Sequence, residues 1–316
     1  MRIAIIGSGG VGCLYGGRLA LAGHDVHFLM RRDLQAVRQS GLTVQSCDGD
    51  FHLEAQAHPR SEDIGPVDLV ICALKATNLD QAEALIRPCI GPKTLVMALM
   101  NGLGVEDHFA EWFGPHRILG GLAFVCINRG KPGIIHHLGY GRLAVGHYQD
   151  DLDTAHRIAK LFKEAKFPVY VPPSLLTARW EKLVWNIPFS TLSVSAGGVS
   201  TKVIIDDPHL HAVAEHLMRE TIATAKAQGC SLDPDSLIKL MFDNTAVMDH
   251  YKPSMLVDFL ERRPLEVDAI LGEPLRRANR LNVPVPYLAM QHALVRHLDQ
   301  LNRGHVVPYD PDEPLQ

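Results

Sequence analysis

The spacing of hydrophobic positions changes about halfway along the chain. In the first half, short apolar runs of the kind that form buried strands alternate with longer stretches in which apolar residues recur at helical spacing. From residue 174 onward only the helical spacing continues. The pattern predicts an N-terminal α/β domain with a doubly wound sheet, followed by an all-α C-terminal domain.

Turn residues divide the first half into its elements. Strands are expected over residues 2–6, 25–30, 67–73, 94–100, 118–127, 142–145 and 169–171, with a hairpin over 42–58 that turns at Asp48-Gly49. Helices are expected over 11–22, 78–90 and 151–165. The glycine-rich stretch 129–141 is interpreted as a link between two strands.

Pro172-Pro173 marks the boundary between the two expected domains, 1–172 and 173–302. Helices in the second half are expected over 175–189, 208–228, 235–244, 255–261, 265–282 and 286–301. Residues 303–316 combine prolines with acidic groups and are expected to form a flexible tail.

A glycine motif follows the first strand. Gly7, Gly9 and Gly12 have the G-x-G-x-x-G spacing, which permits a tight turn, close approach of a pyrophosphate and close helix packing. Three glycines can also mark a plain turn, but a strand precedes these and a helix follows them. The motif therefore predicts a Rossmann-type domain that binds a dinucleotide at the helix N-terminus. The loop residues expected to contact the cofactor are Gly7, Ser8, Gly9, Gly10, Val11 and Gly12.

The residue after the second strand bears on which cofactor binds. NAD-binding domains usually place an acidic residue there, whereas this chain has Arg31-Arg32. A guanidinium suits the 2′-phosphate of NADPH, so Arg31 favours NADPH as cofactor. Solvated loop arginines are the alternative, and for Arg32 the two interpretations are equally good. Asp33 is interpreted as the cap of the next helix.

Polar residues also follow two later strands. Lys75 comes just after the strand at 67–73, and Asn101-Gly102-Leu103-Gly104 follows the strand at 94–100. Ligands bind over the carboxyl ends of parallel strands, so both positions would face the cofactor. The alternatives are a solvated lysine and an ordinary Asn-Gly turn.

The expected helix at 175–189 is unusually apolar for one that contains a lysine. Lys182 and Asn186 are four residues apart and share a face, and the neighbours include Trp180 and Trp185. Burial would lower the pKa of Lys182 toward neutrality, a useful range for a proton donor. A lysine that reaches water at the helix edge is an equally good interpretation.

Two further residues have simple structural interpretations. Ser254 follows a proline and precedes an apolar run, which suits a helix N-cap. Glu266 follows Pro264, in a first turn where a carboxylate favours the helix dipole. Neither residue reveals a function by its position alone.

Composition excludes several classes of function. The 316 residues carry a net charge of −4, which gives no indication of a nucleic-acid or anionic-membrane partner. The six cysteines form no C-x-x-C pair, and His136-His137 on a strand would point to opposite faces, so no metal site is predicted. We see no signal peptide and no run long enough to span a bilayer, and expect a reducing cytoplasm.

Taken together, these motifs resemble those of the ketopantoate reductase (2-dehydropantoate 2-reductase) family over nearly the whole chain, to about Leu301. The matching pieces are G-S-G-G-V-G with Arg31, the strand-end Lys75, Met-Asn101-Gly-Leu-Gly, Trp-x-Lys182-x-x-x-Asn186, and Ser254-Met-x-x-Asp…Glu266-x-Asp-x-x-x-Gly272. The resemblance implies NADPH-dependent reduction of 2-dehydropantoate to (R)-pantoate in pantothenate and coenzyme A biosynthesis. It also raises the possibility of a homodimer.

The resemblance also implies residue roles. Lys182 would be the general acid, and Glu266 would help to place the lysine, the substrate and the cofactor. Ser254 would hold the substrate carboxylate, and Asn101 and Asn186 would bind polar groups of the substrate. Lys75 and Asn101 would also contact the cofactor.

One departure from the family pattern concerns the substrate. The family often has two more asparagines downstream of the lysine helix, but here Ser190 stands four residues after Asn186 and residues 193–202 contain no asparagine. A serine still forms a hydrogen bond with shorter reach. Reduction of another 2-oxo acid, or oxidation of a 2- or 3-hydroxy acid, is therefore the alternative. A non-catalytic NADP(H) sensor is a third hypothesis, but it would have no need of Lys182, Ser254 and Glu266.

Overall fold

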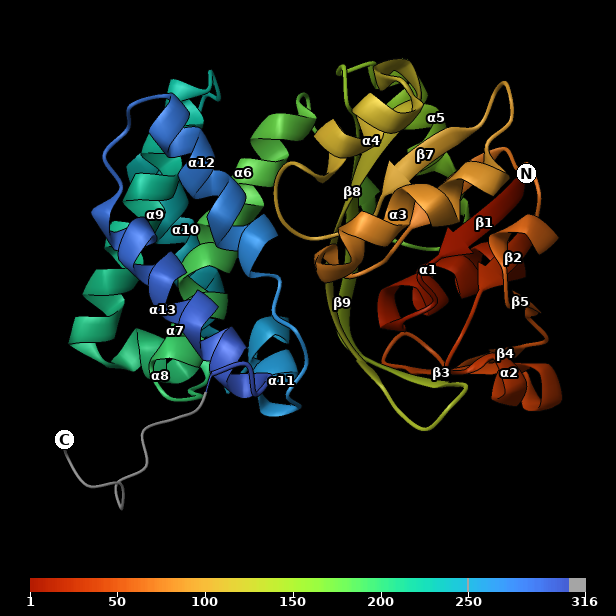
Figure 1. The fold of residues 1–316 in the computed structure, drawn as a ribbon, viewed down its shortest axis with the longest axis horizontal. Helices are drawn as coiled ribbons and strands as arrows, with labels where there is room; N and C mark the ends of the chain where they lie inside the picture. The colour runs from red at the N-terminus through yellow and green to blue at the C-terminus, as the bar shows by residue number, and fades with distance from the viewer. Residues whose placement is uncertain (249, 307–316) are drawn as a thin grey trace. The chain divides into compact units, whose positions relative to one another are not determined.

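The computed structural model describes residues 1–248 and 250–306, and the tail predicted at 303–316 lies mostly outside them. The chain forms two compact units, Met1–Ala178 and Arg179–Gln316 (Figure 1). The division falls inside helix α6 (Leu175–Trp185), beyond the Pro172-Pro173 boundary expected from the sequence. Leu175 and Ala178 pack with Leu122 and Ala144 of the sheet, which is why the first turn of α6 belongs to the first unit.

Within the described residues, the first unit is built on one ten-stranded sheet. Its strand order is β4-β3-β9-β8-β7-β6-β1-β2-β5, with β10 paired to β9. The strands are β1 (Arg2–Ile6), β2 (Asp25–Leu29), β3 (Leu42–Ser46), β4 (Phe51–Leu53), β5 (Gln56–His58), β6 (Leu69–Cys72), β7 (Leu95–Ala98), β8 (Ile118–Arg129), β9 (Ile134–His147) and β10 (Val169–Tyr170). Strands β8, β7, β6, β1, β2 and β5 run parallel, as the sequence predicts for a doubly wound sheet.

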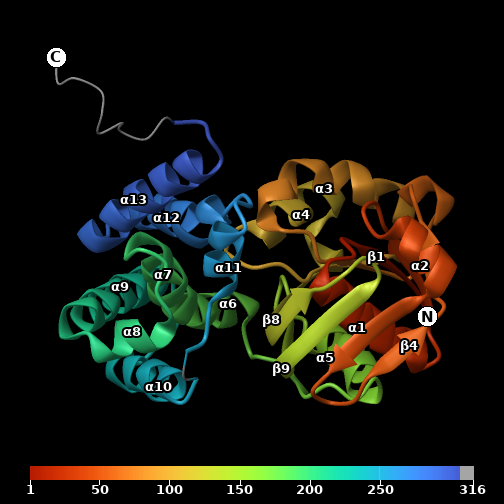
Figure 2. The ribbon, with the colours of Figure 1, turned by 90° about the horizontal axis from the view of Figure 1, so that it is seen from below.

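Helices cover both faces of this sheet (Figure 2). They are α1 (Gly10–Leu21), α2 (Leu34–Ser40), α3 (Leu79–Ile86), α4 (Val105–Phe113) and α5 (Leu152–Glu164), with short 3₁₀ turns at Ser61–Asp63, Ala76–Asn78, Arg87–Cys89 and Pro115–Arg117. Alternate strand residues point to opposite faces, so one strand serves two cores. Ile3 and Ile5 pack toward α1 and α5, while Ala4 and Ile6 pack toward α3 and α4.

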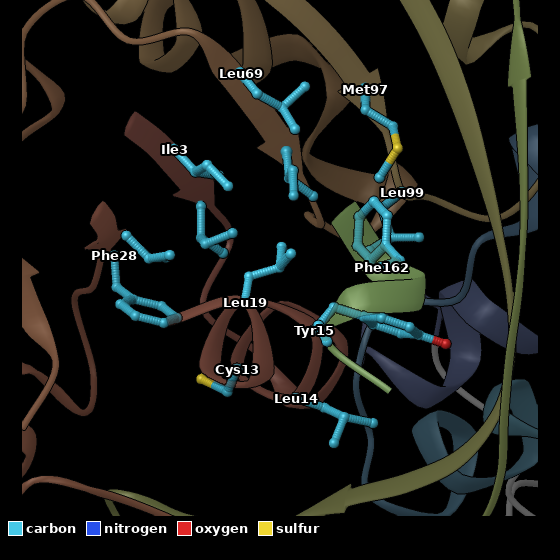
Figure 3. Packing of buried hydrophobic residues seen from close by; sticks show 14 of the residues in the cluster. Ile3, Cys13, Leu14, Tyr15, Leu19, Phe28, Leu69, Met97, Leu99 and Phe162 are labelled. Carbon is cyan, nitrogen blue, oxygen red and sulfur yellow. The ribbon is translucent and has the colours of Figure 1, made fainter. Parts of the chain in front are cut away.

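The core beneath α1 is the larger of the two. Figure 3 shows Ile3, Leu69 and Met97 of neighbouring strands directed toward Leu19 and Tyr15 of α1. The ring of Tyr15 lies 4.4 Å from that of Phe167, and its hydroxyl donates a hydrogen bond to the carbonyl of Gly141 at 3.2 Å. Helix α1 is thereby fixed against the sheet, and its N-terminus is held at the carboxyl end of β1.

Two strand expectations were wrong. The segment 129–141 is not a link, because β9 begins at Ile134 and pairs with both β3 and β8. Gly139 and Gly141 lie at register irregularities of this long strand, and Gly130 and Gly133 lie in the turn before it, which hid the strand in the sequence. The expected hairpin at 42–58 is formed by β3 and β4 only, since β5 pairs in parallel with β2.

The second unit is helical, as predicted. It contains the remainder of α6, then α7 (Thr191–Ser195), α8 (Thr201–Asp206), α9 (Pro208–Ala227), α10 (Pro234–Ala246), α11 (Ser254–Leu260), α12 (Glu273–Arg280) and α13 (Pro286–Asn302). The sequence did not reveal α7 and α8, which are very short. Helix α9 packs against α8, α10, α12 and α13, and Glu220 on α9 accepts hydrogen bonds from the backbone N–H groups of Tyr287 and Leu288, at 3.0 and 2.8 Å.

Two π-helical segments interrupt the expected continuous helices. They are η5 (Asn186–Ser190), which follows α6, and η6 (Asp268–Gly272), which precedes α12. Pro188 lies inside η5 and Pro274 follows η6, and neither has a backbone N–H for the carbonyl four residues earlier. The widened turns accommodate these missing bonds. Such segments are frequent at functional sites.

Candidate active site

Four neighbouring strands of the first unit end at residues that the sequence singled out. In spatial order they are β7, β6, β1 and β2, which are followed by Asn101, Lys75, Gly7 and Arg31. Because these strands are parallel, their carboxyl ends lie along one edge of the sheet. The fold therefore brings the candidate cofactor residues of the first unit to one edge.

The geometry of the glycine loop fits a bound pyrophosphate. Gly7 has a φ of +99°, and a Cβ there would lie 2.6 Å from the backbone nitrogen of Leu74. A Cβ on Gly12 would lie 2.3 Å from the carbonyl oxygen of Gly7, so the helix could not pack as closely. A Cβ on Gly9 would meet no atom within 4 Å. The loop is thus closed on the protein side and open at Gly9, where a phosphate would approach.

Ser8 supports the loop from within. Its hydroxyl donates a hydrogen bond to the carbonyl of Leu29 at 2.8 Å. This bond joins the glycine loop to the end of β2, so the hydroxyl is used for structure. Gly10 is equally constrained, because a Cβ there would lie 3.2 Å from a side-chain atom of Ile127.

The end of β2 carries three charged residues in sequence. Arg31 and Arg32 are exposed, and in the described part of the chain the Arg31 guanidinium has no ion pair or hydrogen bond. Asp33 is 6% exposed and occupies the N-cap position of helix α2, as the sequence predicted, but its side chain makes no cap hydrogen bond. Its Oδ2 instead accepts a hydrogen bond from Arg129 of β8 at 2.6 Å. Tertiary pairing with a distant arginine outweighs the local cap.

Lys75 and Asn101 occupy the loops after β6 and β7. Lys75 is exposed and precedes the 3₁₀ turn Ala76–Asn78. Asn101 is partly buried, and the glycines that follow it have positive φ angles, +92° at Gly102 and +86° at Gly104. Gly104 lies directly before α4, so the loop turns sharply and leaves Asn101 at the strand end.

In the second unit, helix α6 positions Lys182 between two tryptophans. Trp180 is fully buried, and its Nε1–H donates to Oε1 of Gln228 at 2.9 Å, at the end of α9. Trp185 donates in the same way to Oγ1 of Thr245 on α10, at 2.8 Å. The two rings hold α6 in register against the bundle, and the lysine between them is partly buried.

The electrostatic setting of Lys182 is unusual. Its pKa is lowered from 10.5 to about 7, first by burial, which disfavours the ammonium form, and then by the charge of Arg179. The carboxylate of Glu266 acts in the opposite direction. Both Arg179 and Glu266 are buried, with 3% and 5% of their surface exposed. At neutral pH both forms of the lysine are therefore populated, the ammonium as a proton donor and the neutral amine as a proton acceptor.

The remaining candidate residues of the second unit lie on or next to two π-helical segments and helix α11. Asn186 and Ser190 are the first and last residues of η5 and are both buried. Segment η5 contacts α11, which begins at Ser254, and η6, which begins two residues after Glu266. Ser254 is not a helix cap, because Pro253 occupies the N-cap position and makes no side-chain cap bond. Its exposed hydroxyl is available for another role.

Sequence reasoning missed two charged residues, Arg179 and Arg129. Arg179 precedes Lys182 by three residues, so helical spacing combined with the apolar character of α6 was the signal available. Asp33 was placed correctly at the N-cap, but its pairing with Arg129 was not predicted. Arg129 gave no signal, because 96 residues separate it from its partner.

In the described part of the chain, no helix is long and apolar enough to cross a membrane.

Comparison with known proteins agrees with this geometry. The family model described as "Ketopantoate reductase PanE/ApbA" matches residues 3–150, and the model of its C-terminal domain matches residues 174–299. A "2-dehydropantoate 2-reductase" of Nostoc sp. (strain PCC 7120) is 39% identical over 309 residues, which is 96% of both chains.

Solved structures show the same fold. The crystal structure of a 2-dehydropantoate 2-reductase from Geobacter metallireducens GS-15 is similar, with a TM-score of 0.91 and 40% identity over 94% of this chain and 99% of that one. A D-mandelate dehydrogenase, solved with NADH and anilino(oxo)acetate, shares the fold with a TM-score of 0.89 and 22% identity, over 96% of this chain and 99% of that one. On the family models and the identity to curated relatives, this chain belongs to the ketopantoate reductase family.

Proposed function

We propose that this enzyme reduces 2-dehydropantoate to (R)-pantoate with NADPH, and that Lys182 is the general acid. The observation that carries the proposal is the setting of Lys182. A partly buried lysine with a pKa near 7, between buried Arg179 and Glu266, is a proton donor suited to neutral pH. The name of the Nostoc relative supports 2-dehydropantoate as the substrate.

The residues of the first unit fit a nicotinamide dinucleotide. The open position at Gly9 and the N-terminus of α1 would accept the pyrophosphate, as in other dinucleotide-binding domains. The guanidinium of Arg31, which has no partner among the described residues, suits a 2′-phosphate and favours NADPH over NADH. When bound, the cofactor would supply a hydride to the ketone carbon of the substrate.

The chain's own residues would then stabilise the developing negative charge and supply the proton. As the carbonyl carbon is reduced, negative charge develops on its oxygen, and the Lys182 ammonium would stabilise that charge and deliver the proton. Ser254 and Asn186 would bind the substrate carboxylate and other polar groups. Glu266 holds the pKa of Lys182 higher than burial alone would and so keeps more of the acid form.

Ser190 bears on which 2-oxo acid is the substrate. It is buried at the end of η5, one turn beyond Asn186, where relatives often have an asparagine. Another branched or aryl 2-oxo acid therefore remains the alternative substrate on this fold. We expect Ser190→Asn to lower the KM for 2-dehydropantoate more than that for a bulkier 2-oxo acid such as phenylglyoxylate.

The first experiment measures NADPH oxidation by absorbance with purified enzyme. The substrates are 2-dehydropantoate, 2-oxoisovalerate and phenylglyoxylate, and the expected result is the highest kcat/KM for 2-dehydropantoate. Lys182→Ala should lose about 10²–10⁴-fold in kcat while its Kd for NADPH changes little. Lys75→Ala, which removes a lysine at a strand end of the first unit, is the matched control and should weaken NADPH binding instead.

Three outcomes separate the hypotheses. Preference for another acid would reject 2-dehydropantoate and keep the chemistry. A Lys182→Ala enzyme within threefold of wild-type kcat would exclude Lys182 as the acid. NADPH binding without turnover of any acid would favour the non-catalytic sensor.

The homodimer stays a prediction. Light scattering on the purified enzyme would check it.

A further inference from the structure

A group of metal-ligating side chains lies away from the residues discussed so far. Cys47 and Asp48 follow strand β3, and His137 lies on β9, the parallel neighbour of β3. The backbone N–H of Cys47 donates to the carbonyl of His137 at 3.0 Å. One ligand atom from each of the three side chains falls within 4.8 Å of the others. We propose that Cys47, Asp48 and His137 bind a zinc ion.

The distances are close to those of a zinc site. The Cys47 thiol sulfur lies 3.9 Å from both Nε2 and Nδ1 of His137 and 3.9 Å from Oδ1 of Asp48. Zinc bonds of about 2.3 Å to sulfur and about 2.0–2.1 Å to nitrogen or oxygen place tetrahedral ligands roughly 3.5 Å apart. The exposed thiol would have to turn toward Nε2, and the three ligand atoms, which lie within 4.8 Å of one another, would draw together around the ion. Water would complete the coordination.

Hydrogen bonds already hold the ligands in place. Nδ1 of His137 lies 2.8 Å from the hydroxyl oxygen of Ser46, which leaves Nε2 for the metal. The same hydroxyl accepts from the backbone N–H of Asp48 at 3.1 Å, and Oδ1 of Asp50 accepts from the N–H of Ser46 at 2.7 Å. His137 is 2% exposed, so its ring has little freedom to turn away.

The backbone around His137 leaves room for an ion. Both register irregularities between β8 and β9 follow it along β9, and Gly141 has a φ of +122°. A Cβ at Gly141 would come within 3.6 Å of Nε2 of His137 and 3.8 Å of Oδ2 of Asp48. The glycine thus keeps a side chain away from Nε2 of His137 and from Oδ2 of Asp48.

The ligand chemistry selects the metal. A thiolate, an imidazole and a carboxylate suit zinc, whereas magnesium and calcium prefer oxygen ligands alone. The thiolate and the carboxylate together balance the charge of a divalent ion. Arg18 lies 3.5 Å from Oδ2 of Asp48, the oxygen remote from the thiol, and would orient the carboxylate without occupying the ligand oxygen.

The sequence predicted no metal site, because His136 and His137 are adjacent on a strand and would point to opposite faces. They do not act together here, since the partners of His137 come from a turn that lies 90 residues away. The three ligands belong to one compact unit, and the proposal is independent of the reaction proposed above.

Metal titration of the tag-free, chelator-treated full-length enzyme tests the site. Wild-type enzyme should bind one Zn²⁺ in competition with a chromophoric chelator, and Co²⁺ should give a thiolate-to-cobalt charge-transfer absorption. Cys47→Ser should lose that absorption and weaken Zn²⁺ binding by at least ~100-fold, more than loss of an outer-shell partner would cost. Cys47 is exposed, so this variant should fold normally.

Two matched histidine variants test whether His137 is a zinc ligand. His137→Asn should abolish binding, while His136→Asn, at the neighbouring position, should leave it unchanged. The proposal is overturned if wild-type enzyme binds no Zn²⁺ below millimolar concentration, or if Cys47→Ser binds Zn²⁺ and Co²⁺ like wild type. Equal effects of the two histidine variants would also overturn it.

Discussion

The guanidinium of Arg129 donates a hydrogen bond at 2.6 Å to the buried carboxylate of Asp33, and so joins the end of β8 to the residues that follow β2. The other carboxylate oxygen of Asp33, Oδ1, is buried and has no hydrogen bond among the described residues. An acidic residue therefore lies two positions after Arg31, and its charge is balanced mainly by Arg129 and more weakly by Arg32, whose Nε lies 3.9 Å from Oδ1.

This pair should influence the choice of cofactor. Removal of the cation in Arg129→Ala leaves the Asp33 carboxylate with only the weaker 3.9 Å ion pair to Arg32 and should repel a 2′-phosphate, so the Kd for NADPH should rise about tenfold while that for NADH changes less. Asp33→Asn removes the negative charge and should not weaken NADPH binding. Fluorescence titration of both variants with both cofactors measures the effect. Equal losses for the two cofactors in Arg129→Ala would mean that the pair only supports the fold.

Arg31 should act on NADPH alone. Its exposed guanidinium has no protein partner in the described ranges, 1–248 and 250–306, so its removal should cost little stability. Arg31→Ala should raise the KM for NADPH about tenfold or more and leave the KM for NADH nearly unchanged, because only NADPH carries the 2′-phosphate. Arg32→Ala, which removes a neighbouring exposed guanidinium, is the matched control. A similar KM change for both cofactors would rule out a 2′-phosphate contact.

The pH dependence of reduction should follow the protonation state of Lys182. Its pKa is about 7, and the acid form is the one below that pH, so kcat/KM should be level at lower pH and fall about tenfold per unit above it. Oxidation of the product hydroxy acid needs the neutral amine and should show the opposite trend. Initial rates from pH 5.5 to 9 in constant ionic strength measure both profiles.

Glu266 should move this profile in a defined direction. Its carboxylate raises the pKa of Lys182, so Glu266→Gln should shift the inflection to lower pH. Arg179 lowers that pKa, so Arg179→Met should shift the inflection to higher pH, provided that circular dichroism shows a folded enzyme. Shifts in the same direction, or none in either variant, would contradict the electrostatic account of Lys182.

Pro188 should matter for substrate binding through the backbone. It lies inside η5, and its missing N–H favours the widened turn that carries Asn186 and Ser190. Pro188→Ala permits an ordinary α-helical turn, which would rotate the two side chains relative to Lys182. The KM for the 2-oxo acid should rise, and the Kd for NADPH should stay constant. An unchanged KM would show that the π-helical turn does not depend on this proline.

The sequence by itself determined the division into a doubly wound α/β unit and a helical unit, and the family. Strand β1, the glycine loop and α1 were predicted nearly to the residue, because a short apolar run, three glycines at fixed spacing and a helix rich in alanine and leucine act locally. Lys182 was also found from local pattern, since a lysine in an apolar helix is conspicuous. These features depend on neighbours along the chain, which a sequence displays directly.

Only the tertiary structure decided how distant residues pair. It joined the Asp33 side chain to Arg129 in place of a cap hydrogen bond, made residues 134–141 part of β9, and brought His137 beside Cys47. It also set the balance of Arg179 and Glu266 around Lys182, which fixes the pKa of the lysine near neutrality. Burial and charge act through space rather than along the chain, so the sequence supplied the chemical groups and the fold determined which of them meet.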